Sequence, residues 1–218
     1  MRIIFRVKDF EVSLKQLIRR EMKAHHRILF NGNGYTEDWV QEAKRRGLPN
    51  IVGMVDAIPE LAKKESVDLF ERHGVCTEKV LLARADVSYE LYSRTINIEA
   101  LTMIDMAGKD IIPSVIRFTT EVAQSVHAVE SIGGDPGVQR DLLDDVTALL
   151  KEAKAALADL RVKQSKAVEL TGKEQARFYY KTVCPAMQNL RNPIDRLEMM
   201  VSGNLWPMPT YDELLFNV

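Results

Sequence analysis

The chain has 218 residues, 46% of them hydrophobic and 28% charged, as in a soluble globular protein large enough to bury a core. Its 30 Lys and Arg residues nearly balance 31 Asp and Glu residues, and the net charge of -1 argues against nucleic acid or an anionic membrane as partner. The two cysteines, with no apolar run of membrane-spanning length and no signal peptide, predict a cytoplasmic protein without a disulfide framework.

The first part of the chain predicts short elements of mixed type. Residues 3–7 are apolar enough for a short strand, and the apolar spacing over 10–23 predicts an amphipathic helix. Residues 27–30 predict a second short strand or an extended segment. The Asn-Gly-Asn-Gly run at 31–34 predicts a tight turn with positive φ. We therefore expect a small mixed remnant before the main helical part.

Capping residues predict two shorter helices next. Thr36 is a suitable N-cap for the first, and Gly47 ends it. The second is expected to have Pro59 in its first turn and to end at Gly74. Thr77 then caps the element that leads into the longest helical pattern.

Residues 88–107 form the pattern around which the rest is expected to be arranged. Its apolar side chains cover more than one helix face and are Leu91, Tyr92, Ile96, Ile98, Leu101, Met103, Ile104, Met106 and Ala107. A surface helix shows one apolar stripe, whereas coverage on several sides predicts a helix enclosed by neighbours. We expect this helix to be the central rod of a bundle.

Helical periodicity extends over most of the remaining chain. Pro113 predicts a bend at residues 111–114, and the Gly- and Pro-rich residues 131–137 predict a loop. Three- and four-residue apolar steps then run over 138–166.

A capping box at Thr171 begins the final long helix, which Pro185 and Pro193 are expected to bend. Its apolar stripe has the spacing of antiparallel or coiled-coil packing and consists of Met187, Leu190, Ile194, Leu197 and Val201. Residues 205–218 are too apolar to remain in water, so they are expected to dock on this chain or another, with Thr210 capping a last turn. The fold predicted is mostly α, a bundle of long antiparallel helices.

Metal-binding patterns are weak. His25 and His26 are adjacent and diverge on a helix, and His127 stands alone. His73 and Cys76 have a ligand-like spacing without a second pair nearby. Because zinc normally takes three or four ligands, no metal-ligating residue is predicted.

Catalytic patterns are equally weak. Cys184 has no neighbouring base in sequence, which favours a structural thiol over a thiolate. Glu99 and Asp105 lie on different helix faces and do not form an acid–base pair. No catalytic residue is predicted.

Anion-binding patterns have simpler explanations. The loop at 31–34 lacks the Lys and the Ser or Thr of a phosphate loop, which favours a plain turn. A basic cluster on one amphipathic helix is usually a solvated face; its members are Arg19, Arg20, Lys23, His25, His26 and Arg27. No cofactor-binding residue is predicted.

Three segments together resemble the C-terminal part of type III glutamine synthetases. They are residues 27–39, which continue into 43–50, residues 93–107 and residues 205–216, in the family's order and covering nearly the whole chain after Phe10. Residues 55–77 are similar to the segment that closes the catalytic domain in other glutamine synthetases.

The resemblance implies a family that joins glutamate and ammonia with ATP and a divalent metal such as Mg²⁺, through glutamyl phosphate. It also implies stacked rings of subunits, so the expected partners are other synthetase subunits or a catalytic domain, in a homo-oligomer. The family's catalytic groups lie on an N-terminal β-grasp domain and a β-rich catalytic domain, and none maps onto this sequence. The loop at 31–34 resembles the family's glutamate-binding loop, but Tyr35 and Thr36 replace its Met-His.

The resemblance further implies two parts, with residues 1–75 as the incomplete end of the catalytic domain and residues 76–218 as a helical domain. A natural truncation, a split gene and an artificial boundary all remain open. We expect a chain that is inactive alone, caps the catalytic domain and contributes subunit contacts. Association is expected through an apolar patch around Phe5, Phe10, Phe30 and Trp39.

Two alternatives remain at this point. The first is a stand-alone helical interaction module that binds a partner through its C-terminal aromatic segment. The second, and weaker, is a small-molecule enzyme that uses the loop at 31–34.

Overall fold

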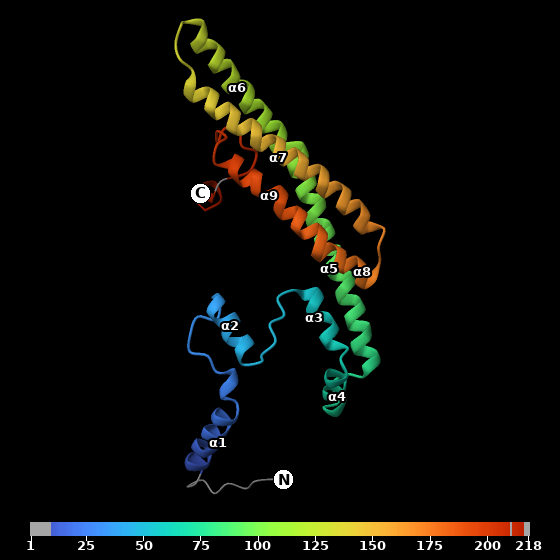
Figure 1. Cartoon of the computed structure of the whole chain (residues 1–218). Helices are drawn as coiled ribbons and strands as arrows, with labels where there is room; N and C mark the ends of the chain where they lie inside the picture. The colour runs from blue at the N-terminus through green and yellow to red at the C-terminus, as the bar shows by residue number, and fades with distance from the viewer. Residues whose placement is uncertain (1–9, 210, 216–218) are drawn as a thin grey trace. The chain divides into compact units, whose positions relative to one another are not determined.

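The computed structural model describes residues 10–209 and 211–215, and every regular element among them is a helix (Figure 1). Two compact units, Met1–Val52 and Gly53–Val218, divide the chain and are described separately. The mostly α-helical prediction is confirmed. The expected division at residue 75, which concerns membership of a catalytic domain, stays a prediction.

The mixed remnant expected near the N-terminus is not present among the described residues. Residues 27–30 form no strand, because the 3₁₀ turn His26–Ile28 leads into Leu29, which is extended but has no paired neighbour. A lone strand has no neighbour with which to complete its hydrogen bonds. The strand expected at 3–7 lies outside the described residues.

The unit Met1–Val52 contains α1 (Phe10–Ala24) and α2 (Glu37–Arg45). Thr36 is the N-cap of α2, as predicted, although its hydroxyl donates to the Asn33 carbonyl instead of capping the helix. Gly47 follows α2 with a φ of 69°, a left-handed conformation that glycine adopts without strain, so the predicted stop is confirmed.

The unit Gly53–Val218 begins with two short helices, α3 (Met54–Leu61) and α4 (Lys64–Arg72), where the sequence predicted one. Pro59 lies inside α3, not in a first turn, because the helix already begins after Gly53. The Ser66 hydroxyl donates to the Glu60 carbonyl at 2.7 Å and closes the break between the two helices. The stop at Gly74, with φ of 65°, and the N-cap at Thr77 are both as predicted.

Three long rods make up the rest of this unit. The first is continuous and consists of α5 (Glu78–Met106), the π turn η3 (Ala107–Ile111) and α6 (Ile112–Ser131). The second is α7 (Gly137–Val168), and the third combines α8 (Gly172–Phe178), the π turn η4 (Tyr179–Val183) and α9 (Cys184–Glu198). Figure 1 shows α6 and α9 lying along α7, which runs in the opposite direction. The antiparallel bundle is confirmed.

Pro113 and Pro185, which were expected to bend the helices, lie in continuous helical rods. Pro113 and Pro185 each come two residues after a π turn, η3 or η4. Proline cannot donate a backbone hydrogen bond and crowds the preceding turn, and a wider π turn relieves that crowding while the rod continues. The rod is therefore unbroken at residues 111–114, where a bend was predicted, and the π turn comes just before them, at Ala107–Ile111.

The described residues of this unit hold three clusters of buried side chains. One of them joins α3 to α5 and α8, and the other two form the core of the bundle. Of these two, one centres on Leu160, Tyr179 and Leu190, and the other on Val146, Leu149 and Leu197. The first also holds a polar network, because Asn97 Oδ1 accepts hydrogen bonds from Gln164 Nε2 and Tyr179 Oη, both at 2.9 Å. These bonds link all three rods.

The expectation that the central helix is enclosed on several sides is wrong for the described residues. The α5 side chains Leu91, Ile98 and Leu101 are exposed, as are Glu99 and Asp105. The physical reason is that α5 packs on the other rods from one side only. Its outer face is rich in apolar side chains, and no described residue of the unit Gly53–Val218 covers it.

Part of the C-terminal segment docks on its own bundle, as one prediction allowed. Trp206 is buried in the cluster around Leu197, with its Nε1 unpaired among the described residues. The burial of Trp206 disfavours the alternative in which a stand-alone module binds its partner through the aromatic residues of this segment. The last helix, α10 (Tyr211–Leu215), leaves Leu214 and Leu215 exposed, and Thr210 lies outside the described residues.

Candidate functional site

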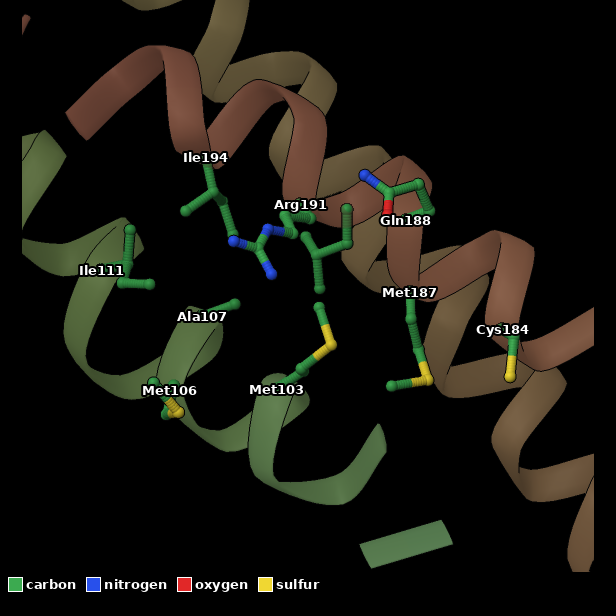
Figure 2. Close-up of a pocket in the computed structure, with 10 residues that line it drawn as sticks. Met103, Met106, Ala107, Ile111, Cys184, Met187, Gln188, Arg191 and Ile194 are labelled. Carbon is green, nitrogen blue, oxygen red and sulfur yellow. The ribbon is translucent and has the colours of Figure 1, made fainter. Parts of the chain in front are cut away.

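An apolar groove of about 370 Å³ lies between the end of α5 and α9 (Figure 2). Met103 and Ala107 line one wall, and Met187 and Ile194 line the other. Figure 2 shows the sulfur atoms of Met103 and Met187 between the two helices. Methionine adapts to irregular apolar shapes, so the groove suits an apolar side chain better than a polar substrate.

The π turns position both walls of this groove. Ala107 and Ile111 of one wall are the first and last residues of η3, and Cys184 follows η4 directly. Such turns are frequent at functional sites because the extra residue re-aims the side chains that come after it. The charged residue of the lining, Arg191, is already bound to Asp195 at 3.1 Å.

Cys184 lies at one end of the groove, 3.7 Å from the Tyr92 hydroxyl. Burial raises the pKa of the Cys184 thiol, and it also raises the pKa of Tyr92. Both groups therefore stay protonated near neutral pH, which disfavours a nucleophilic thiolate. The interpretation of Cys184 as a structural thiol fits this environment.

The unit Met1–Val52 is organised around the Arg46 guanidinium. It binds Glu42 at 2.5 Å and donates to the backbone carbonyls of Leu29 and Arg27. It also lies about 6 Å from the ring centres of Phe30 and Trp39, which pack 4.6 Å apart. Hydrogen bonds from Arg45 and Arg46 lower the pKa of Glu42 to about 2. Arg46 is thus committed to holding this unit together.

The apolar patch expected around four aromatic residues is only partly assembled. Phe30 and Trp39 pack on each other and are half-buried, while Phe10 lies in α1 and is half exposed. Phe5 lies outside the described residues.

The loop at 31–34 forms a turn closed by asparagine. The Asn33 side chain accepts a hydrogen bond from the Tyr35 amide at 3.0 Å, so that amide is not available to an anion. Positive φ was predicted here, but neither Gly32 nor Gly34 adopts it. Asn33 closes the turn through its side chain and makes the left-handed conformation unnecessary.

The other candidate residues are scattered. Within residues 10–209 and 211–215, no group of three or more His, Cys, Asp or Glu side chains is placed to hold a metal ion. Asp105 pairs with Lys109, and Glu21 of the basic helix pairs with Arg20 at 2.8 Å. Among the described helices, none is long and apolar enough to cross a membrane. The predicted absence of catalytic, cofactor-binding and metal-ligating residues stays a prediction.

Comparison with known proteins decides the family. Residues 13–130 match the model of the glutamine synthetase C-terminal domain. The chain belongs to this family. It is 33% identical to a glutamine synthetase of Butyrivibrio fibrisolvens over 96% of the chain, and 29% identical to the type-3 glutamine synthetase of Dictyostelium discoideum over 97%.

A glutamine synthetase of Bacteroides fragilis (strain YCH46) is 27% identical to this glutamine synthetase C-terminal chain over 92% of its length. The chain spans about 30% of the Butyrivibrio and Dictyostelium relatives and 28% of the Bacteroides one. The resemblance inferred from the sequence is therefore confirmed at the level of the family.

The groove of this glutamine synthetase C-terminal chain was missed by sequence reasoning. Met103 and Met187 are far apart in sequence, and only the packing of α5 against α9 brings them together. The stripe that contains Met187 was assigned to helix packing, which is correct for its neighbours Leu190 and Leu197. No signal in the sequence distinguished the groove from the core.

Proposed function

We propose that this chain is the C-terminal helical part of a glutamine synthetase, that it supplies scaffold and subunit contacts, and that it is inactive alone. This proposal rests on the exposure of helix α1 to solvent. None of its residues is buried, although the helix has an apolar face. Nothing described within the unit Met1–Val52 covers that face.

The apolar side chains of α1 are large and well exposed. Each of them is at least 40% accessible to solvent, and the set includes Val12, Leu14, Leu17, Ile18 and Met22. A 15-residue helix is marginal in water without tertiary packing, so a covering surface is expected. The relatives contain much more polypeptide than the part matched here. We propose the catalytic portion of a synthetase as the surface that covers α1.

The proposal also assigns the chemistry to that other polypeptide. In the complete family enzyme, ATP and Mg²⁺ would be held there, and residues 1–75 of this chain would belong to the end of the same catalytic domain. The partners proposed are other synthetase subunits in a cytoplasmic homo-oligomer. The protonated Cys184 and the fully engaged Arg46 support a role without catalysis for this chain.

The proposal is tested by measuring the ATP-dependent formation of glutamine from glutamate and ammonia with Mg²⁺. The purified chain alone is expected to show no turnover above the rate without protein. The full-length Butyrivibrio fibrisolvens enzyme, assayed in parallel, serves as the positive control. Turnover that scales with the concentration of the chain and survives repurification would overturn the proposed inactivity.

A further inference from the structure

The outer face of α5 carries an apolar stripe that no described residue of the unit Gly53–Val218 covers. Its members are three, four or seven residues apart with charged residues between them, so they lie on one side of the helix. The exposed fractions are 42% for Val80, 62% for Val87, 59% for Leu91, 64% for Ile98 and 46% for Leu101. The buried positions of α5 lie on the opposite side and are Leu81, Ala85, Tyr89, Ser93 and Ala100.

This spacing is that of a coiled-coil seam. Arg84, Arg94 and Asp105 occupy the remaining positions of the same stripe. Apolar side chains hold five of the eight positions of this stripe, on a helix that already packs into a core through its other face. This pattern indicates a second helix as its partner. The stripe stops where the π turn η3 begins at Ala107.

The charges along the stripe favour one arrangement of two identical helices. In a parallel pair, Arg84 would face Arg84, and like charges would repel. In an antiparallel pair centred between Arg94 and Thr95, Arg84 of each copy faces Asp105 of the other, because both residues are equally far from the centre. The same centre places Leu91 opposite Ile98.

The charges nearest to that centre are already compensated within each copy. Arg94 is paired with Glu90 of its own helix at 2.5 Å, which reduces repulsion between the two copies of Arg94. Asp105 pairs with Lys109, but its side chain stays 58% exposed and can accept a second cation. No ion pair involving Arg84 is found within the described residues, which leaves its guanidinium available.

Surface hollows along α5 have the same symmetry. One is lined by Val80, Arg84 and Val87, with Leu61 at its side, and the other by Leu101 and by Thr102, Ile104, Asp105 and Met106. An antiparallel pair with the stated centre lays the first hollow of one copy over the second hollow of the other.

We propose that the outer face of α5 pairs with the same face of a second copy of this chain, antiparallel, about a twofold axis between Arg94 and Thr95. The contact is self-complementary, as a closed dimer requires. This inference deepens the proposed function and rests on it in one respect, because it names one of the subunit contacts proposed there. It does not depend on what covers α1.

The first test is the mass of the 218-residue chain, measured by sedimentation over a wide concentration range. The wild type is expected to form a species of twice the chain mass. The variant with Leu91→Glu and Ile98→Glu is expected to remain monomeric. Val162→Glu, a change at a 54% exposed apolar position of α7, is expected to dimerise like the wild type.

The second test exchanges charges across the axis. Arg84→Glu alone or Asp105→Lys alone places like charges opposite each other, and each should weaken the dimer by at least about tenfold. The double variant restores opposite charges at both ends and should recover most of the lost affinity. Recovery of this kind is not expected from a dimer that uses another face.

A third test locates the axis by disulfide formation. In a chain with Cys76→Ser and Cys184→Ser, Thr95→Cys is expected to give a covalent dimer under mild oxidation. Val162→Cys in the same background is expected to stay monomeric under the same conditions. Far-UV circular dichroism confirms that each variant is folded.

The inference is overturned if the wild type is monomeric throughout, or if it dimerises but Thr95→Cys does not cross-link and the charge exchange gives no recovery. A wild-type chain that self-associates only with the catalytic portion of a synthetase added would also overturn it. None of these results bears on glutamine formation by the chain alone. Failure of the α5 contact and failure of the proposed inactivity are therefore distinguishable.

Discussion

Replacing Leu160 with alanine is expected to lower the free energy of unfolding by about 2–5 kcal/mol. Leu160 lies in α7 with no exposed surface, in the core cluster that also contains Tyr179 and Leu190. The substitution removes three buried side-chain carbons, so their burial is lost. It also leaves a cavity, because the packed helices around Leu160 cannot move inward far enough to fill the space. The measurement is urea-induced unfolding monitored by far-UV circular dichroism.

The matched control lies two residues further along the same helix. Val162→Ala removes apolar carbons from a side chain that is 54% exposed, so it should change the free energy of unfolding by no more than about 0.5 kcal/mol. Equal effects of the two substitutions would contradict the assignment of Leu160 to the core.

Replacing Asn97 with leucine is expected to cost about 2–4 kcal/mol, because it removes the acceptor shared by two donors. Tyr179 Oη and Gln164 Nε2 both donate to Asn97 Oδ1 at 2.9 Å, and Tyr179 is 1% exposed. A buried hydroxyl without a partner loses its hydration and gains nothing in return. The same urea unfolding measures the loss.

A double-mutant cycle separates this explanation from simple misfit of the leucine. Tyr179→Phe removes the stranded hydroxyl, so in the Asn97→Leu background it should cost clearly less than it does in the wild type. Additive effects of the two substitutions would show that the hydrogen bond between them contributes little.

Helix ends were predictable where a single residue decides the local conformation. Thr36 and Thr77 precede helices, and Gly47 and Gly74 end them with positive φ, as the sequence indicated. Each of these depends on one residue type with a strong local preference. The long rods were predictable as well, because periodic apolar spacing persists over many turns.

The failures have two causes, one local and one that depends on contacts distant in sequence. Pro113 and Pro185 looked like bends, but a preceding π turn accommodates each of them. The apolar coverage of α5 was correctly seen, but it was wrongly assigned to neighbours in the bundle, which leave the outer face of α5 exposed. Leu91 and Ile98 are exposed, and periodicity alone does not say whether an apolar face meets the same chain or another.

The candidate site was harder to foresee. The groove needs Met103 of α5 and Met187 of α9 on facing walls, a juxtaposition set by the crossing of two rods. By contrast, the family was accessible from sequence, because residues 93–107 and 205–216 resemble it over long continuous stretches. Family membership and site geometry thus depend on different kinds of information.

The most direct measurement of the central claim is binding between this chain and the catalytic portion of a synthetase. The partner is the Butyrivibrio fibrisolvens enzyme without the part matched here, and that enzyme's own C-terminal part is the positive control. We predict saturable binding that Leu14→Asp with Leu17→Asp weakens by at least about tenfold, while Val162→Asp leaves it unchanged. If the control binds but the chain does not, or if the α1 variant binds like the wild type, the proposed role of α1 as a docking helix is contradicted.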